Sequence, residues 1–85
     1  MNTIENWTIE WFIKNTDAEK SEILEKLSEN YFLEGWIDSL KFILFISEIE
    51  DEFQISFSND EFQNRKFATI NGIIEIIKER VNGKK

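Results

Sequence analysis

Apolar side chains recur at spacings of three and four residues in the first part of the chain, the spacing that places side chains on one face of an α-helix. The residues that follow this pattern are Ile4, Trp7, Trp11 and Phe12. They predict an amphipathic helix over about residues 3–15, with its apolar side packed against a core.

The pattern weakens over residues 16–38. Thr16-Asp17-Ala18-Glu19 has the form of a capping box and predicts the start of a short helix. The apolar residues of that helix are Ile23, Leu24 and Leu27. The rest of the segment is interpreted as a loop anchored in the core, in which Gly35 breaks the chain before the next helix. The expected anchors are Tyr31, Phe32, Leu33 and Trp36.

A longer helix is predicted over about residues 39–53. One of its faces is almost entirely apolar, and we expect this face in the core. Its residues are Phe42, Phe45, Ile46, Ile49 and Phe53. The opposite face is mostly polar, but Leu40 and Leu44 lie on it and Ile43 lies at its edge. A contiguous apolar strip on the solvent side of a helix is typical of a docking surface.

Two further helix starts follow in the last third of the chain. Ser58-Asn59-Asp60-Glu61 has the form of a capping box and predicts a short helix over about residues 59–65. Thr69 is expected to cap a last helix over about residues 69–81. The apolar face of that helix consists of Ile70, Ile73, Ile74, Ile77 and Val81. The chain is therefore predicted to be all-α, one domain over residues 1–85, with three main helices and one or two short ones in a bundle.

The composition narrows the chemistry that this bundle can perform. Its 85 residues include no histidine and no cysteine, so histidine acid–base pairs, thiolate nucleophiles and zinc sites cannot be assembled. We therefore expect that the chain is not an enzyme and holds no metal ion. The formal net charge of −7 argues against binding to nucleic acid or to an anionic membrane, and it favours a partner with a basic surface.

The start of the chain has no basic segment followed by an apolar one, as a secretory signal would have. No stretch approaches the roughly 18 apolar residues that are needed to span a bilayer. We therefore expect a cytoplasmic protein without membrane insertion, and a monomer.

The candidate for chemistry is Asp38-Ser39-Leu40, at the predicted start of the long helix. Asp38 can cap this helix, which leaves Ser39 in the first turn with its hydroxyl toward solvent. A phosphodiester on that hydroxyl would lie beside unpaired backbone N–H groups and the positive end of the helix dipole. The chain offers no base to activate Ser39, so a partner enzyme would have to do so. Taken alone, the tripeptide is more typical of a plain capping pair.

The context of the tripeptide changes this interpretation. It is preceded by Phe32-Leu33-Glu34-Gly35-Trp36-Ile37, followed by Glu48-Ile49-Glu50-Asp51-Glu52-Phe53-Gln54-Ile55, and the last helix is entered through Phe67-Ala68-Thr69-Ile70. In this order and spacing, over about residues 31–78, the chain resembles the acyl carrier protein family. The resemblance implies a fold of three major helices and a shorter one.

The resemblance also implies a function. A phosphopantetheinyl transferase would move a 4'-phosphopantetheine arm from coenzyme A onto Ser39, with Asp38 helping to orient the transfer and Mg²⁺ held chiefly by the transferase. A loading ligase would then place acyl or aminoacyl groups on the arm as thioesters, for use by downstream enzymes. These partners would read the second main helix. Its expected docking residues are Leu40, Ile43, Leu44, Ser47, Glu48 and Asp51.

Two features set this chain apart from the fatty-acid carriers that it resembles. Many of those carriers have acidic residues where this chain has Lys41 and Leu44, and Trp36-Ile37 looks more like D-alanyl and other specialised carriers. We expect a dedicated partner with an apolar groove over Leu40, Ile43 and Leu44. Eight Phe and three Trp leave little room between the helices, which favours a small cargo such as an aminoacyl group.

Two other classes of protein remain open from the sequence. An acidic helical inhibitor or immunity-type protein that masks a basic enzyme fits the charge and the size. A helical adaptor for amphipathic peptides fits the exposed apolar strip. Neither of them needs a free hydroxyl at Ser39, so covalent modification of this residue distinguishes a carrier from both.

Overall fold

Four α-helices and two short 3-10 helices follow one another along residues 3–83, the residues that the structure, a computed structural model, describes. They are α1 (Thr3–Asn15), α2 (Lys20–Glu25), α3 (Ser39–Phe53), η1 (Asn59–Gln63), η2 (Arg65–Ala68) and α4 (Ile70–Asn82). These residues form no β-strand, and Asn30 and Thr69 form one isolated antiparallel bridge. The predicted all-α class is confirmed, and the three main helices lie within one residue of their predicted bounds.

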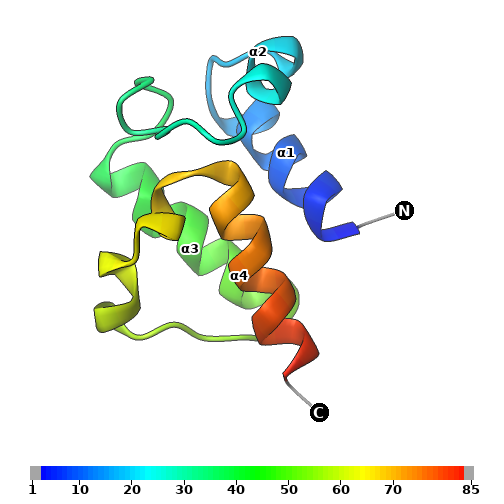
Figure 1. The fold of residues 1–85 in the computed structure, drawn as a ribbon, viewed down its shortest axis with the longest axis vertical. Helices are drawn as coiled ribbons and strands as arrows, with labels where there is room; N and C mark the ends of the chain where they lie inside the picture. The colour runs from blue at the N-terminus through cyan, green and yellow to red at the C-terminus, as the bar shows by residue number, and fades with distance from the viewer. Residues whose placement is uncertain (1–2, 84–85) are drawn as a thin grey trace.

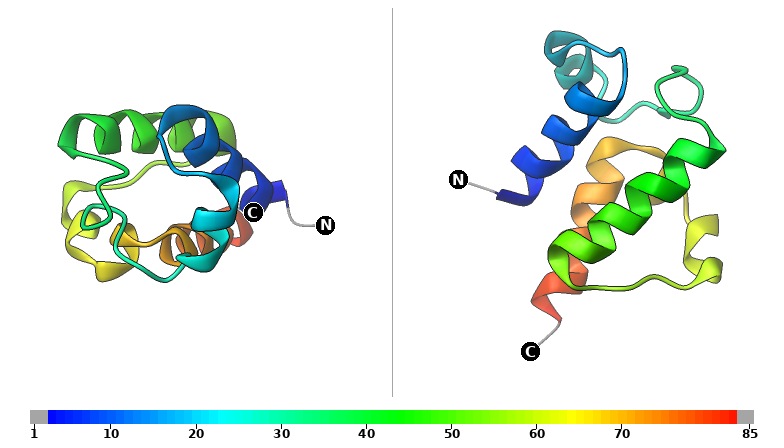
Figure 2. Two further views of the ribbon diagram at one scale, coloured as in Figure 1. Left: turned by 90° about the horizontal axis from the view of Figure 1, so that it is seen from above. Right: turned by 180° about the vertical axis from the view of Figure 1, so that it is seen from behind.

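The helices surround one core (Figure 1). Seen from above, α3 lies along one side of the molecule, and η2 and α4 lie along the other (Figure 2). α1 packs against α2 and α4, and η2 packs closely against α4. The core therefore lies along only one side of α3, and this is true of its first turn as well.

Aromatic rings fill the space between α1 and α3. The Phe45 ring of α3 has its centroid 4.5 Å from that of Trp11 and 5.1 Å from that of Phe12, both on α1. The opposite side of the core is a row of side chains from α4 that are mostly isoleucines. The buried residues of α4 are Ile70, Gly72, Ile73, Ile74, Ile76 and Ile77. Rings and branched side chains together form the packed interior between these helices.

Side-chain caps begin α3 and α4, as predicted. The Asp38 carboxylate accepts a hydrogen bond from the Lys41 N–H at 2.9 Å, and the Thr69 hydroxyl oxygen accepts one from the Gly72 N–H at 2.9 Å. Each cap satisfies one of the backbone donors that a helix start leaves unpaired.

The short helix that the sequence predicts over residues 59–65 is two 3-10 helices. The predicted capping box is present, and the Glu61 carboxylate accepts from the Ser58 N–H at 2.9 Å. Asn64 separates η1 from η2 because its backbone is extended, with φ −70° and ψ 130°. Its side chain then caps η2 by accepting from the Lys66 N–H at 2.9 Å.

The capping box predicted at residues 16–19 is wrong. The Thr16 hydroxyl donates to the Phe12 carbonyl at 2.6 Å, so it closes the end of α1. α2 begins only at Lys20, its N-cap residue Glu19 makes no side-chain capping bond, and the helix is six residues long. Of the apolar residues expected there, Ile23 is buried, but Leu24 is exposed and Leu27 lies beyond the helix end.

The loop before α3 is anchored by two of its four expected residues. Tyr31 and Trp36 are buried, and the Tyr31 hydroxyl donates to the Phe67 carbonyl of η2. Burial raises the pKa of the Tyr31 phenol, so it stays neutral in the folded protein. Phe32 and Leu33, expected as anchors, are exposed. The physical reason is a turn at Asn30, whose side-chain oxygen accepts from the N–H groups of both residues at 2.8 and 3.2 Å and directs their side chains outward.

The contact between η2 and α4 depends on the absence of a side chain at Gly72. A Cβ atom at this position would lie 2.2 Å from the carbonyl oxygen of Lys66. The two backbones therefore touch, and any larger residue would force them apart.

Candidate functional site at the start of α3

Ser39 is the first residue of α3, and its side chain is exposed. Asp38 precedes it in an extended conformation, with φ −116° and ψ −175°, and caps the helix through Lys41 N–H. The carbonyl of Asp38 accepts from the Phe42 N–H at 2.8 Å, which closes the first helical turn. The predicted placement of Ser39 in the first turn with its hydroxyl toward solvent is confirmed.

Two backbone donors beside Ser39 remain available for an anion. The hydrogen bonds described for residues 3–83 engage the N–H groups of Lys41 and Phe42, but not those of Ser39 and Leu40. Both lie at the positive end of the dipole of a 15-residue helix. A phosphodiester on the Ser39 oxygen would be stabilised there, so the local geometry fits a phosphopantetheine arm.

Other serines lack this combination. Ser47 lies in the middle of α3, and Ser21 lies in the six-residue α2. The Ser28 hydroxyl accepts from the Asn71 side chain at 3.0 Å, and the Ser58 hydroxyl donates to Glu61 at 3.3 Å. Among the residues described, Ser39 is the serine that lies in the first turn of a long helix.

Lys41, which replaces the acidic residue of many fatty-acid carriers, points away from this site. Its ammonium donates to the carbonyl of Asn15, the last residue of α1, at 2.7 Å. A cation at that position also complements the negative end of the α1 dipole. The positive charge of Lys41 is therefore used to join the end of α1 to the start of α3.

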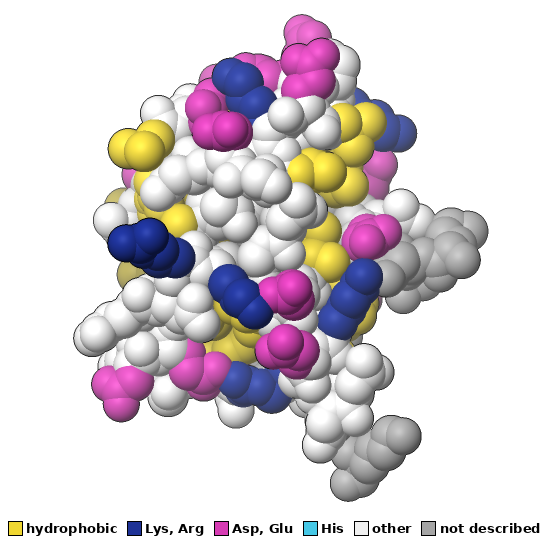
Figure 3. Space-filling model, viewed as in Figure 1, with side chains coloured by type: hydrophobic (Ala, Val, Ile, Leu, Met, Phe, Trp, Pro, Cys, Tyr) yellow, Lys and Arg dark blue, Asp and Glu magenta, His cyan; other side chains and the backbone are white. Residues whose placement is uncertain are grey.

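The apolar strip predicted on α3 is present at the surface. The Leu40 side chain is 80% exposed, Ile43 is 64% exposed and Leu44 is 48% exposed. Hydrophobic side chains also reach the surface in separate places on the face that Figure 3 shows, between charged groups. The strip on α3 differs from these because it begins directly beside Ser39.

The other expected docking residues have different environments. Ser47 and Asp51 are exposed on α3. Glu48 is half-buried, because its carboxylate accepts from the indole N–H of the buried Trp11 at 3.1 Å. The sequence pattern did not indicate this bond, which joins α1 to α3 two turns below Lys41 and limits how far Glu48 can reach toward a partner.

An open hollow of about 520 Å³ runs along α3 on the side of Ser39. Phe42, Ile43 and Ile46 line it, and their spacing from Ser39 places them on the same face of the helix. Phe57 and Phe62 line it as well. Together with Phe42 they belong to a chain of phenylalanine rings, here called the aromatic wall, with centroids 5.1 to 5.7 Å apart from each ring to the next. In order of contact, the wall consists of Phe32, Phe42, Phe62, Phe67 and Phe57.

The predicted core is wrong for two phenylalanines of α3. Phe42 and Phe53 were expected in the core, but both are half-buried. Phe42 packs between the exposed Phe32 and η1, and Phe53 meets the Trp7 ring at a centroid distance of 5.4 Å. The face of α3 that carries Phe42 therefore borders the hollow rather than the centre of the core.

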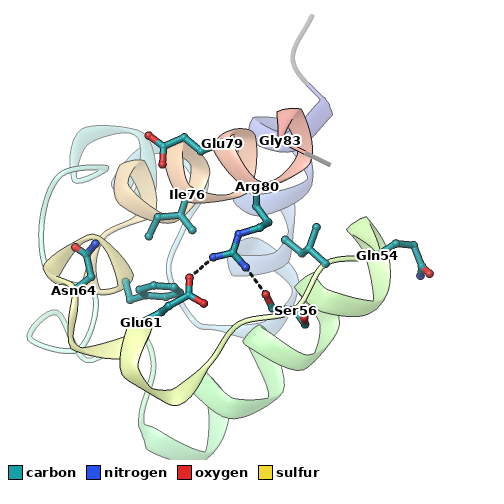
Figure 4. A pocket seen from close by; sticks show the side chains of 10 residues that line it. Gln54, Ser56, Glu61, Asn64, Ile76, Glu79, Arg80 and Gly83 are labelled. Atoms are coloured by element: carbon teal, nitrogen blue, oxygen red, sulfur yellow. Dashed lines mark hydrogen bonds and ion pairs between the residues drawn. The ribbon is translucent and has the colours of Figure 1, made fainter. Parts of the chain in front are cut away.

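Another hollow, of about 610 Å³, lies at the far end of α3 and has a structural role (Figure 4). The Arg80 guanidinium projects into it, donates to the Ser56 carbonyl and pairs with the Glu61 carboxylate. It also lies 5.0 Å from the centroid of the Phe57 ring. Since α3 rises about 1.5 Å per residue over its 15 residues, this hollow at its far end is about 20 Å from Ser39, and the Arg80 guanidinium in it is already paired with Glu61 and Ser56.

Residues 3–83, the part of the chain described, contain neither a candidate metal site nor a helix that could span a membrane. No group of His, Cys, Asp and Glu side chains there could hold a metal ion. No helix in that range is long and apolar enough to cross a membrane.

The start of α3 thus has the form of an attachment site for an anionic group on a serine of a small helical bundle. The chain matches the family model described as phosphopantetheine attachment site over residues 12–77. This match covers most of the chain, which therefore belongs to the family of phosphopantetheine-bearing domains. No curated protein and no solved structure matches the chain. The family match gives no support to the alternative of an acidic masking protein.

Proposed function

We propose that this protein is a specialised carrier that holds acyl or aminoacyl groups on a 4'-phosphopantetheine arm attached to Ser39. The observation that carries the proposal is the position of Ser39, an exposed hydroxyl in the first turn of α3, within the matched family range. The arm supplies a terminal thiol that carries the cargo as a thioester.

The residues around Ser39 hold the start of α3 in place, and this positions the Ser39 hydroxyl to attack the phosphorus atom of coenzyme A. In the attachment step the Ser39 oxygen bonds to the phosphorus that bears pantetheine, and the phosphoanhydride bond of coenzyme A breaks to release adenosine bisphosphate. The hydroxyl proton passes to a base on the transferase, because no histidine is present. Asp38 keeps the first turn formed, and the N–H groups of Ser39 and Leu40 stabilise the phosphodiester that results. The carrier itself catalyses no reaction.

The partner enzymes are proposed to dock on α3. A transferase, a loading ligase and a downstream thioester-using enzyme all need access to this helix, and its exposed strip of Leu40, Ile43 and Leu44 fits an apolar groove. Asp51 adds a charge farther along, where a basic partner residue could pair with it. We further propose that the carrier acts as a monomer in the cytoplasm.

The cargo is proposed to be small. Phe42, Phe57 and Phe62 of the aromatic wall line the hollow along α3, and the core behind it is filled by rings from α1 and α3. A long acyl chain would have to displace these rings, whereas an aminoacyl group could stay on the arm outside. Loading with a long acyl chain should therefore leave the methyl NMR signals of Ile46 and Ile49 nearly unchanged. Large shifts of these signals would contradict the proposal.

The test of the attachment site is the intact mass of the protein after incubation with coenzyme A, Mg²⁺ and a broad-specificity phosphopantetheinyl transferase. The wild type should gain one phosphopantetheinyl group, and Ser39→Ala should gain none. Ser21→Ala is the matched control, because it removes an exposed hydroxyl from another helix, α2, and should be loaded normally. An unmodified, folded wild type would overturn the proposed function.

A further inference from the structure

One side of the hollow along α3 is formed by a segment that has little packing of its own. Phe57 precedes η1, Asn59 and Phe62 belong to η1, and all three residues line the hollow. No residue of this five-residue 3-10 helix is buried. Such a short helix is not stable by itself. The position of this side of the hollow therefore depends on contacts that come from outside η1.

Arg80 of α4 supplies the polar contacts to this segment (Figure 4). Its guanidinium donates to the Ser56 carbonyl in the loop before η1 and pairs with the Glu61 carboxylate within η1. It also lies 5.0 Å from the centroid of the Phe57 ring. The other hydrogen bonds described for η1 stay within residues 58–64. In the part of the chain described, Arg80 is thus the polar connection between η1 and the rest of the bundle.

The remaining contacts of the segment are between aromatic rings. The rings of Phe57 and Phe62 meet the buried Phe67 ring edge-on, at centroid distances of 5.3 and 5.1 Å. An edge-on ring contact is weak and tolerates a range of positions. The bonds of a guanidinium to a carboxylate and a carbonyl are directional and charge-assisted, so they fix one position. Arg80 therefore determines where Phe57 and Phe62 stand at the hollow.

We propose that Arg80 is a positioning residue that limits the size of the cargo, because it prevents Phe57 and Phe62 from moving away from α3. This inference deepens the proposed function and rests on attachment of the arm at Ser39. A long acyl chain becomes buried in the hollow only if these two rings separate from Ile46, the buried side chain of α3 that lines it. An aminoacyl group stays on the arm and needs no such movement.

The experiment compares the methyl NMR signals of Ile46 before and after Ser39 receives an arm that bears a decanoyl or an alanyl group. A broad-specificity phosphopantetheinyl transferase with Mg²⁺ transfers each arm from the corresponding coenzyme A thioester. Arg80→Ala removes the guanidinium, whereas Arg80→Lys keeps the charge but lacks the fork that reaches two acceptors. Lys78→Ala is the matched control, because it removes another cation of α4, one that pairs with Glu5 of α1 at 3.2 Å.

The decanoyl arm should shift the Ile46 signals several times more in Arg80→Ala than in the wild type or in Lys78→Ala. Arg80→Lys should give an intermediate shift. The alanyl arm should leave these signals nearly unchanged in every variant. Each shift is the difference between the loaded and unloaded forms of one variant, so a structural change caused by the substitution itself cancels.

The outcomes separate this inference from the proposed function. Equal decanoyl shifts in the wild type and Arg80→Ala, whether small or large, would overturn the role of Arg80 and leave attachment at Ser39 standing. An equal increase in Lys78→Ala would also overturn it, because the effect would not be specific to η1. Failure of the wild type to be loaded would remove both proposals. Thermal melting accompanies each variant. If Arg80→Ala does not fold, Arg80→Lys decides the test, and a wild-type shift in that variant would overturn the inference.

Discussion

The polar and apolar groups at the two ends of α3 are in opposite situations: they are paired at the far end and left unpaired or exposed at the start. At the far end, the Phe57 N–H donates to the Glu50 carboxylate at 2.8 Å, and the Gln54 side chain donates to the Asp51 carbonyl at 2.7 Å. Arg80 then joins the following loop to η1. At the start, the N–H groups of Ser39 and Leu40 make none of the described hydrogen bonds, and the leucines nearby face water.

This difference distinguishes the far end of α3, which has a structural role, from its start, where the attachment site is proposed. Groups that pair with each other inside the chain stabilise the fold and leave little for a ligand. Groups that the fold holds in place but leaves unpaired are available to a partner or a modification. A hollow of about 770 Å³ lies at the start of α3, beside Asp38 and Lys41, and one of about 610 Å³ lies at the far end, so the two ends differ in the pairing of their groups and not in the presence of a hollow.

The largest effect on the free energy of unfolding should come from removing the Tyr31 hydroxyl, which anchors the loop before α3. In Tyr31→Phe the buried Phe67 carbonyl loses its partner, which should cost about 2 kcal/mol of unfolding free energy. Denaturant unfolding measures this loss. Because the chain has one tyrosine, alkaline titration of the wild type adds a check. The raised pKa means that phenolate absorbance should appear only as the protein unfolds, and that stability falls as the pH rises above 10.0, the ordinary value. Phenolate formation in the folded protein would contradict burial of the hydroxyl.

A smaller effect should follow from removing the cap beside Ser39. Asp38→Ala should lower the unfolding free energy by about 1 kcal/mol and slow arm transfer, because the first turn of α3 frays. Asp38→Asn is the matched control, since asparagine caps a helix as well as aspartate does. If Asp38→Asn keeps stability but loses transfer, the carboxylate charge acts in the transfer itself. Unchanged melting of Asp38→Ala would show that the cap does not hold the turn.

The smallest effect should come from a change at the far end of α3, at Glu61. The Ser58 N–H and the Arg80 guanidinium hold the pKa of Glu61 below its ordinary value of 4.5. The ionised carboxylate therefore stabilises the fold at neutral pH, and this contribution is lost as the pH falls through the lowered pKa. Glu61→Gln should melt slightly below the wild type at pH 7, and the difference should disappear in acid. Arm transfer to Ser39 should not change, and a slowed transfer would mean that the two ends are coupled.

The sequence predicted the helices correctly where the spacing of apolar residues and the capping residues indicated the same bounds. α1, α3 and α4 have three- and four-residue apolar repeats over more than two turns, and Asp38 and Thr69 cap the last two. Such signals are local, so they do not depend on the rest of the fold. The Thr16 hydroxyl donates to the Phe12 carbonyl and accepts from the Ala18 N–H at 3.2 Å, but α2 begins only at Lys20, so Thr16 is not its cap.

The geometry of the candidate site was predictable at Asp38 and Ser39 and less so in its surroundings. Asp38 and Ser39 follow from capping chemistry, and the exposed strip of α3 follows from helical periodicity. The roles of Lys41 and Glu48 could not be predicted, because their partners, Asn15 and Trp11, are distant in sequence and meet them only after folding. Leu33 was placed in the core because leucine is usually buried. The signal that could have corrected this was Asn30, a residue typical of turns.

Gly72 links the packing of the bundle to the loop before α3 and the proposed docking surface. The missing side chain lets η2 lie against α4, and η2 presents the Phe67 and Ala68 carbonyls to the hydroxyl and the N–H of Tyr31. Tyr31 holds one end of the turn that displays Leu33. A methyl group added at residue 72 would push η2 outward and carry the Leu33 turn with it. An alteration in the interior could therefore misalign the docking surface while every residue on that surface stays the same.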